Sequence, residues 1–269
     1  MTDVHERAGA ALAEPDPRRK CLAAAALRED WRRGRVRPGA GAPPTLLVPG
    51  RPARPRLVSP RAVERRGMGS VAGRAALLHA LAHIELNAVD LALDAVYRFR
   101  TLPPDYYGDW LRVAAEEAGH FTLLRAHLHG LGFDYGDFSA HDGLWEMARK
   151  TAHDPLVRMA LVPRVLEARG LDVTPGLIAK LRGVGDTRAV EILELIRREE
   201  VGHVAIGNRW YAYLCAARGL EPLATFRRLL AEYGAPRLRP PFDFAARRRA
   251  GFTEPELAWL ETLSARARS

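Results

Sequence analysis

Apolar residues at helical spacing, repeated in four segments, limit the folds open to this chain more than any other feature. The segments cover residues 70–100, 105–130, 139–170 and 187–218. In them alanine, leucine, isoleucine and valine recur at intervals of three and four, the pattern of a helix with one buried face. The third segment restarts at Pro155 and has Pro163 as a kink or a second restart. Four long helices with short connections predict an all-α fold, an antiparallel four-helix bundle.

Shorter elements flank these four segments. Residues 5–33 are rich in alanine and leucine but broken at Pro15 and Pro17, so they predict short helices. Seven prolines between residues 35 and 66 predict an extended, irregular stretch whose only strand-like pieces are 45–48 and 57–58. Further helices are expected over Thr174–Arg182, Glu221–Tyr233, Phe242–Arg249 and Glu254–Arg266, with a linker over Pro236–Pro241.

Charge divides the chain into three regions. Residues 1–66 carry a net charge of +8, residues 67–217 of −3 and residues 218–269 of +4. We therefore expect a basic N-terminal arm, a central bundle and a C-terminal helical extension packed on the bundle. Of 41 basic residues only three are lysine, a skew that GC-rich coding also produces, so the arginines alone do not indicate nucleic acid.

Cysteine content and hydropathy exclude several classes of protein. Two isolated cysteines, Cys21 and Cys215, argue against a zinc knuckle, an iron–sulfur site or a disulfide framework. No uninterrupted apolar run approaches the roughly 18 residues that span a bilayer. The basic residues 18–20 precede only seven apolar ones, which favours an amphipathic helix over an export signal. We expect a cytoplasmic protein without a membrane partner.

One five-residue pattern occurs twice. Residues 116–120 are Glu-Glu-Ala-Gly-His and residues 199–203 are Glu-Glu-Val-Gly-His, each inside a predicted long helix. Both contain Glu-x-x-His, and residues three apart share one face of a helix. A carboxylate and an imidazole so placed can reach one metal ion or two adjacent ions. A single Glu-x-x-His is common on surface helices, but its recurrence in the same pattern is a stronger indication.

Each pattern also has a partner glutamate one helix earlier. Glu85 precedes Glu117 by 32 residues, and Glu167 precedes Glu200 by 33. Both earlier glutamates lie in apolar helical segments, where a charge is costly unless it is paired or metal-bound. Carboxylate-bridged di-iron and di-manganese bundles use this arrangement, with one Glu from each of two helices and Glu-x-x-His from the other two.

The chain resembles the ferritin-like superfamily of carboxylate-bridged di-iron proteins. It is most similar to an uncharacterised, mostly bacterial branch, and distantly to tRNA-modifying di-iron hydroxylases. The resemblance covers roughly residues 52–252 and rests on four motifs, residues 83–85, 116–120, 163–172 and 200–203. It implies a ferritin-like four-helix bundle whose metal ligands are Glu85, Glu117, His120, Glu167, Glu200 and His203. In the superfamily, Glu117 and Glu200 would bridge the ions, and Glu85 and Glu167 would bind terminally.

This ligand set implies two iron ions, although manganese or a mixed manganese–iron pair fits the same donors. We expect an O2-dependent oxygenase or oxidase of the hydroxylase type, acting on an unidentified substrate with an electron donor. One alternative is a tRNA-type hydroxylase acting on RNA through the basic ends of the chain. Another is a non-catalytic or ferroxidase-like metal-binding protein, and a plain helical interaction protein is the remaining one. The sequence is compatible with a homodimer.

Other polar residues near the motifs are weaker candidates. Glu116 and Glu199 lie about 100° around their helices from the neighbouring ligands, so we expect them to face solvent or pair with arginine. His79 and His83 flank Glu85, and we expect His83 to support a metal ligand or to be a packed histidine in preference to binding metal itself. Asp90 or Asp94 could support a ligating histidine. Arg164 and Arg169 could steady carboxylates, bind an anionic substrate or form ordinary salt bridges. The aromatic residues expected in the core or at helix ends are Tyr106, Tyr107, Trp110, Trp145, Trp210, Tyr211 and Tyr213.

Overall fold

The computed structural model describes residues 2–41, 48–64, 66–234 and 238–266. It is 70% helical with few strands, which confirms the predicted all-α class. The chain separates into two compact units, residues 1–146 and 147–269. The division at residues 66 and 217 that the charge pattern indicates stays a prediction.

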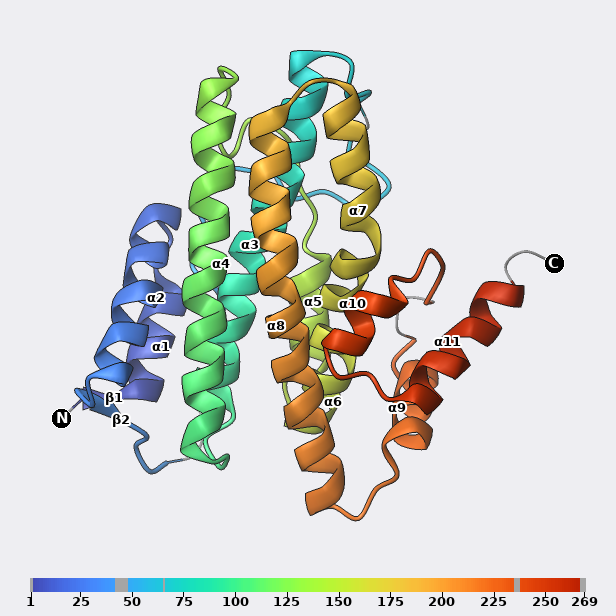
Figure 1. Cartoon of the computed structure of the whole chain (residues 1–269). Helices are drawn as coiled ribbons and strands as arrows, with labels where there is room; N and C mark the ends of the chain where they lie inside the picture. The colour runs from blue at the N-terminus through green and yellow to red at the C-terminus, as the bar shows by residue number, and fades with distance from the viewer. Residues whose placement is uncertain (1, 42–47, 65, 235–237, 267–269) are drawn as a thin grey trace. The chain divides into compact units, whose positions relative to one another are not determined.

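The first unit is built on two long helices, α3 (Val71–Arg98) and α4 (Pro104–Gly130), which pack along each other. Helix α1 (Val4–Ala13) packs on α3, and α2 (Pro17–Arg32) packs on α4 (Figure 1). These contacts place the predicted N-terminal arm directly against the long helices. Two short strands that the sequence does not indicate, β1 (Thr2–Asp3) and β2 (Val36–Arg37), pair in parallel.

The second unit is also built on a long helix pair. Helix α6 (Pro155–Leu161) continues through a π-helical turn, η1 (Val162–Glu167), into α7 (Ala168–Gly183), and both η1 and α7 pack on α8 (Thr187–Ala217). Three further helices follow: α9 (Pro222–Glu232), α10 (Phe244–Arg249) and α11 (Glu254–Arg266). Residues of α7, α8, α10 and α11 share one apolar cluster that includes Leu171, Val204 and Leu257.

Helix boundaries follow local chemistry closely. Helices α2, α4, α6 and α9 begin with proline, which lacks an N–H that would otherwise stay unbonded in the first turn. The side chain of Ser70 accepts a hydrogen bond from the Gly73 N–H at the start of α3, and that of Asp186 accepts one from the Ala189 N–H at the start of α8. Helix α5 (Gly143–Lys150), at the junction of the units, starts later than predicted because Ala140 pairs with the backbone of residues 56 and 58.

The expected break after Gly170 is wrong, since α7 runs unbroken through Gly170 and Pro175. Asp172 lies in this stretch of α7 and anchors it to α10. Its buried carboxylate accepts hydrogen bonds from Arg247 Nε and Nη2 at 2.9 and 2.7 Å, a contact 75 residues away in sequence. Of the two strand-like pieces, residues 57–58 form an isolated bridge at Leu57, and 45–48 lie outside the described residues except for Val48. Two residues of the predicted 236–241 linker are also outside them.

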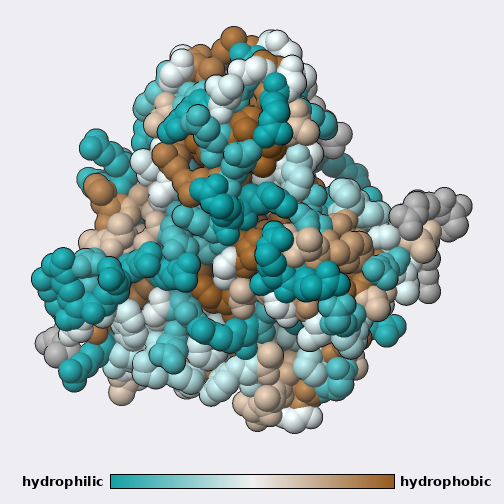
Figure 2. Space-filling view, in the orientation of Figure 1, coloured by the Kyte–Doolittle hydropathy of each residue, from teal (hydrophilic) through white to brown (hydrophobic). Residues whose placement is uncertain are grey.

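Helix α3 is, among the described residues, the one helix long and apolar enough to cross a membrane by length and composition. However, 72% of its most apolar stretch is buried within the protein, and core helices pass the same test. Large exposed apolar side chains are scattered, and hydrophilic residues cover much of the face in Figure 2 with smaller apolar areas between them. The compartment stays a prediction.

Candidate metal centre

The first unit brings Glu85, Glu117 and His120 together in its interior. Glu85 lies on α3, and the other two lie one turn apart on α4. His120 Nδ1 is 3.1 Å from Glu85 Oε2 and 3.1 Å from Glu117 Oε2. Glu117 is fully buried, and the other two are at most 5% exposed. We call these three residues the first triad. Its ligand atoms lie within 4.8 Å of one another, close enough to contact one metal ion.

Burial of two neighbouring carboxyl groups in the first triad favours the binding of a positive charge between them. Burial raises the pKa of Glu85, and the neighbouring Glu117 carboxylate raises it further. Burial alone would lower the pKa of His120, but hydrogen bonds with Glu117 and Glu85 outweigh it and raise that pKa well above its ordinary value. A proton on the imidazole therefore holds the two carboxylates together, and a metal cation could take the place of that proton.

The second unit holds the other three predicted ligands. Glu200 and His203 lie one turn apart on α8, with His203 Nδ1 3.5 Å from Glu200 Oε1. His203 is fully buried, whereas the Glu200 side chain is 13% exposed. Glu167 is half-buried and is the last residue of η1, which packs on α8. We call these residues the second triad. The backbone elements place all three in one helix pair, as in the first unit.

Comparison with known proteins supports a family but no activity. A family model described as "Protein of unknown function (DUF455)" matches residues 13–258. The chain belongs to the DUF455 family. An uncharacterized protein of Haemophilus influenzae is 50% identical to this DUF455 chain over 216 residues, which cover 78% of the chain and 75% of the relative. No solved structure matches the chain.

The neighbouring glutamate of the first motif behaves as predicted in this DUF455 protein. Glu116 Oε1 accepts a hydrogen bond from Arg112 Nε at 2.8 Å and lies 3.6 Å from Arg28 Nη1, so it pairs with arginine. Glu199, its counterpart in the second motif, is half-buried.

His79 and His83 are packed histidines that hold a loop. His79 Nε2 accepts a hydrogen bond from the Gly136 N–H at 2.9 Å, and its ring stacks on Tyr135. His83 contacts the Tyr135 hydroxyl through Nδ1 at 2.8 Å and the His141 carbonyl through Nε2 at 3.1 Å. Burial lowers the pKa of both histidines to about 4. Both nitrogens of His83 are therefore engaged away from the first triad.

Arg164 and Arg169 connect helices and loops within the second unit. Arg164 is buried, pairs with Glu256, and lies over the rings of Tyr211 and Phe226 at 4.2 and 4.4 Å. Arg169 Nη1 donates to the carbonyls of residues 239 and 241. The ordinary salt-bridge interpretation therefore holds for Arg164. Of the seven aromatic residues expected in the core or at helix ends, all are buried except Tyr213, which is 45% exposed.

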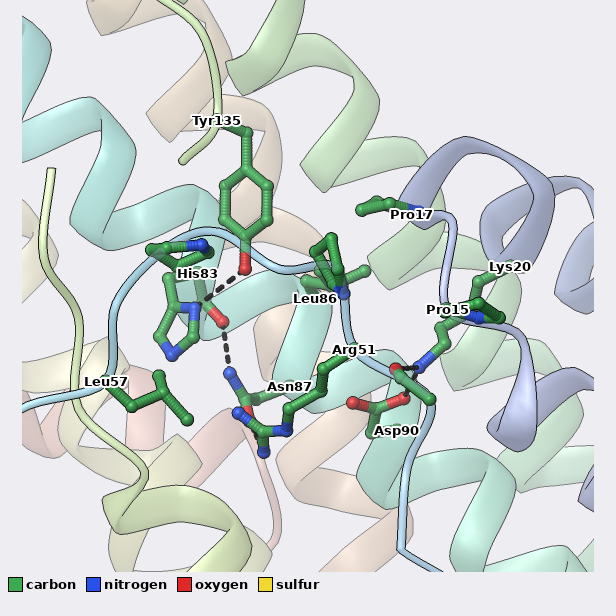
Figure 3. A pocket seen from close by; sticks show the side chains of 13 residues that line it. Pro15, Pro17, Lys20, Arg51, Leu57, His83, Leu86, Asn87, Asp90 and Tyr135 are labelled. Carbon is green, nitrogen blue, oxygen red and sulfur yellow. Dashed lines mark hydrogen bonds and ion pairs between the residues drawn. The ribbon is translucent and has the colours of Figure 1, made fainter. Parts of the chain in front are cut away.

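A small pocket that the sequence does not indicate lies along α3 and is lined by prolines, leucines and a few polar side chains (Figure 3). Helical spacing places its α3 residues on the side away from Glu85. Lys20 enters it from α2 and pairs with Asp90, while its ammonium also donates to the Gly50 carbonyl at 2.9 Å. Arg51 Nη2 donates to Asn87 Oδ1 at 3.2 Å and to Asp142 Oδ1 at 2.5 Å. These groups satisfy one another, so the pocket fastens α2 and the proline-rich segment to α3. Asp90, one of two possible supports for a ligating histidine, pairs with Lys20.

Proposed function

We propose that this protein binds two metal ions through its two triads and acts as an O2-dependent oxygenase or oxidase on an organic substrate. The observation that carries the proposal is the buried first triad, in which two carboxylates surround one imidazole nitrogen. The second triad has the same composition and the same Glu-x-x-His spacing. The proposal requires the α3–α4 and α7–α8 pairs to combine as a ferritin-like antiparallel four-helix bundle, as the sequence resemblance implies.

The donor set fits iron. Carboxylate oxygens and imidazole nitrogens suit Fe or Mn, and four carboxylates offset the charge of two divalent cations. His120 Nδ1 faces both carboxylates of its triad, so it is the nitrogen that would bind the metal. Glu117 and Glu200 would bridge, and Glu85 and Glu167 would bind terminally.

When bound, a reduced iron pair would supply two of the electrons that O2 takes up, and the substrate would supply the other two as it gains one oxygen atom; the second oxygen atom would leave as water, and the external electron donor would reduce the iron again. The protein itself would position the metal ligands and exclude water from the site. Apolar residues next to the triad on α3 and α4, among them Ala82, Ala88, Ala114 and Phe121, are buried and exclude water. The proton on His120 Nδ1 must leave for that nitrogen to bind metal, so metal binding is coupled to proton release.

Metal analysis tests the proposal directly. Protein reconstituted without oxygen with Fe(II) should retain about two metal ions per chain, and the double variant Glu117→Ala with His203→Ala should lose them. Glu116→Ala is the matched control, because it removes a neighbouring glutamate that pairs with arginine, and it should load like wild type. Wild-type protein that retains neither iron nor manganese would contradict the proposal.

Product analysis then separates the oxygenase from a ferroxidase-like protein. The reduced, iron-loaded protein is mixed with O2 and cell extract, and extract components are compared by mass spectrometry before and after. A new product heavier by one oxygen atom supports the oxygenase. Oxidation of iron without any organic product supports the ferroxidase-like alternative.

A second candidate, an RNA-acting hydroxylase, is favoured by a basic groove in the first unit. The groove is lined by Arg54, Arg56 and Arg66, by loop residues that include Phe138, and by two acidic residues, so its net charge is only +1. Glu64 lies 2.9 Å from Arg66 and Asp137 lies 3.8 Å from Arg54. The Arg66 guanidinium lies 5.5 Å from the Phe138 ring. Arginines beside aromatic rings suit phosphates and stacked bases. The groove's loop packs on the His79 face of α3, away from Glu85, so an RNA bound there would have to extend to reach the metal ligands.

Fluorescence anisotropy with a labelled single-stranded RNA tests this candidate. We expect binding that weakens with salt and is reduced in Arg56→Glu more than in Arg188→Glu, a charge-matched surface change in the second unit. No binding at low salt, or equal losses in both variants, would remove the candidate.

A further inference from the structure

The π-helical turn of the second unit carries a proline that meets a glycine on α8. Pro163 is the second residue of η1. A Cβ built at Gly207 would lie 2.3 Å from Pro163 Cβ and 2.4 Å from Pro163 Cγ, closer than real side chains approach. The two helices can therefore pack this tightly only because residue 207 has no side chain.

The same proline accounts for the wide turn. In a regular α-helix a proline removes one hydrogen bond, and its ring collides with the carbonyl four residues earlier. An inserted π turn relieves that collision without ending the helix, and such turns recur at functional sites. Because the turn ends at Glu167, the direction of this side chain is set by the extra residue of the turn.

The Pro163–Gly207 contact lies about one helical turn from two residues of the second triad. Helices α7 and α8 are joined by a short turn and pack along each other (Figure 1), so they run antiparallel. Four residues beyond Pro163 is Glu167, and four residues before Gly207 is His203. Four residues are about one turn of α8 and somewhat less than one turn of the wider η1, so the contact brings Glu167 and His203 to a similar level of the helix pair. Glu200 lies one further turn along the same face of α8.

We propose that Pro163 and Gly207 form a register clamp that positions Glu167 against His203 as a ligand of the second metal ion. The inference rests on the proposed function, because it assigns Glu167 to metal binding. Neither clamp residue binds metal, so both are positioning residues. A methyl group at residue 207 would push η1 away from α8. Loss of the proline would let the turn relax toward α-helical geometry and rotate Glu167 by up to about 100°.

Cobalt(II) titration of the full-length protein, followed by the visible absorption of bound cobalt, tests the clamp. Wild type should bind two ions with two distinguishable spectral components. Gly207→Ala and Pro163→Ala should keep the first component unchanged and weaken binding of the second ion by at least about tenfold. Glu167→Ala serves as the reference for loss of that component. The variant with both clamp substitutions should regain part of the second component lost in Gly207→Ala, because the colliding ring is gone.

Two controls keep folding separate from metal binding. Gly176→Ala places a methyl group in open space on α7 and should bind like wild type. Pro163→Ala removes heavy atoms and adds only a backbone amide hydrogen, so it tests the clamp even if Gly207→Ala fails to fold by circular dichroism.

The outcomes separate the two proposals. If Glu167→Ala loses the second component while both clamp variants keep it at wild-type affinity, the clamp is overturned and the proposed function stands. If wild type binds no cobalt, or Glu167→Ala binds it unchanged, the metal assignment of Glu167 is wrong and the clamp falls with it.

Discussion

The two units carry the same five-residue motif but hold it in different surroundings. In the first triad, two regular α-helices bring one imidazole nitrogen within 3.1 Å of two buried carboxylates. In the second, His203 is 3.5 Å from a partly exposed Glu200, and Glu167 ends a distorted turn. The motif determines which residues share a helix face. The neighbouring helix determines how deeply the triad is buried and how close its side chains lie.

The supports behind the triads differ as well. Behind Glu85, α3 is fastened by the Lys20–Asp90 pair and by two histidines that hold the loop at residues 133–138. Behind Glu167 there is a proline–glycine contact. We therefore expect the first triad to be rigid and closed to water, and the second to be more adaptable. The following changes test this difference, from the largest expected effect to the smallest.

Lys20→Met should lower the free energy of unfolding by about 3 kcal/mol, because it leaves Asp90 buried without its partner, and burial, which already raises the pKa of Asp90 to about 6, then forces this carboxyl to take up a proton. Urea unfolding measures the loss. Adding Asp90→Asn should recover much of it, and Arg188→Met at the surface should change stability by less than about 0.5 kcal/mol. A loss below about 1 kcal/mol for Lys20→Met would show that α3 is not held from this side.

Acid should loosen the first unit before the second. The folded-state pKa of His79 and His83, about 4, lies below the unfolded value of 6.5. Their contribution is therefore present above pH 6.5 and is lost as the pH falls toward 4. The loss is up to about 3 kcal/mol for each histidine. Hydrogen exchange should show loss of protection in the first half of α3 and at residues 133–138 before α8. Simultaneous loss in α8 would contradict the expected order.

Glu117→Ala should weaken metal binding more than Glu200→Ala does. We expect a loss of more than about 100-fold for the first and nearer tenfold for the second. Water can replace the partly exposed Glu200 carboxylate but has no access to fully buried Glu117. Competition with a chelator of known affinity measures both values. Equal losses would mean that the two triads are equally closed.

Metal-free Glu85→Gln should be slightly more stable than metal-free wild type, by about 1 kcal/mol. The change replaces a carboxyl whose charged form is disfavoured by burial and by the neighbouring Glu117 with a neutral amide, and it keeps a hydrogen-bond acceptor for His120. Glu200→Gln, in the more exposed group, should shift stability by less than about 0.5 kcal/mol. Thermal unfolding in the presence of a chelator compares them, and a destabilised Glu85→Gln would show that its charge is needed to hold His120.

Much of the fold and part of the candidate site could be predicted because they depend on local spacing. The long helices α3, α4 and α8 begin and end within a few residues of the predicted limits. The one-turn spacing of Glu117 and His120 places both on one face, and the apolar surroundings of Glu85 indicated burial that the structure confirms. The Lys20–Asp90 pair could not be predicted, because its partners are 70 residues apart and neither belongs to a motif.

By itself the sequence determined the helical class, the main helix limits and the two sets of carboxylates and imidazoles, since periodicity and proline placement act over a few residues. Only the tertiary structure decided that the helix at Pro163 widens instead of ending and that α7 continues through Pro175. It also decided that His79 and His83 hold a loop and do not join the first triad. These outcomes depend on Gly207, Arg247 and residues 135–141. Local propensity does not determine these features, because they depend on contacts between residues far apart in the chain that form only on folding.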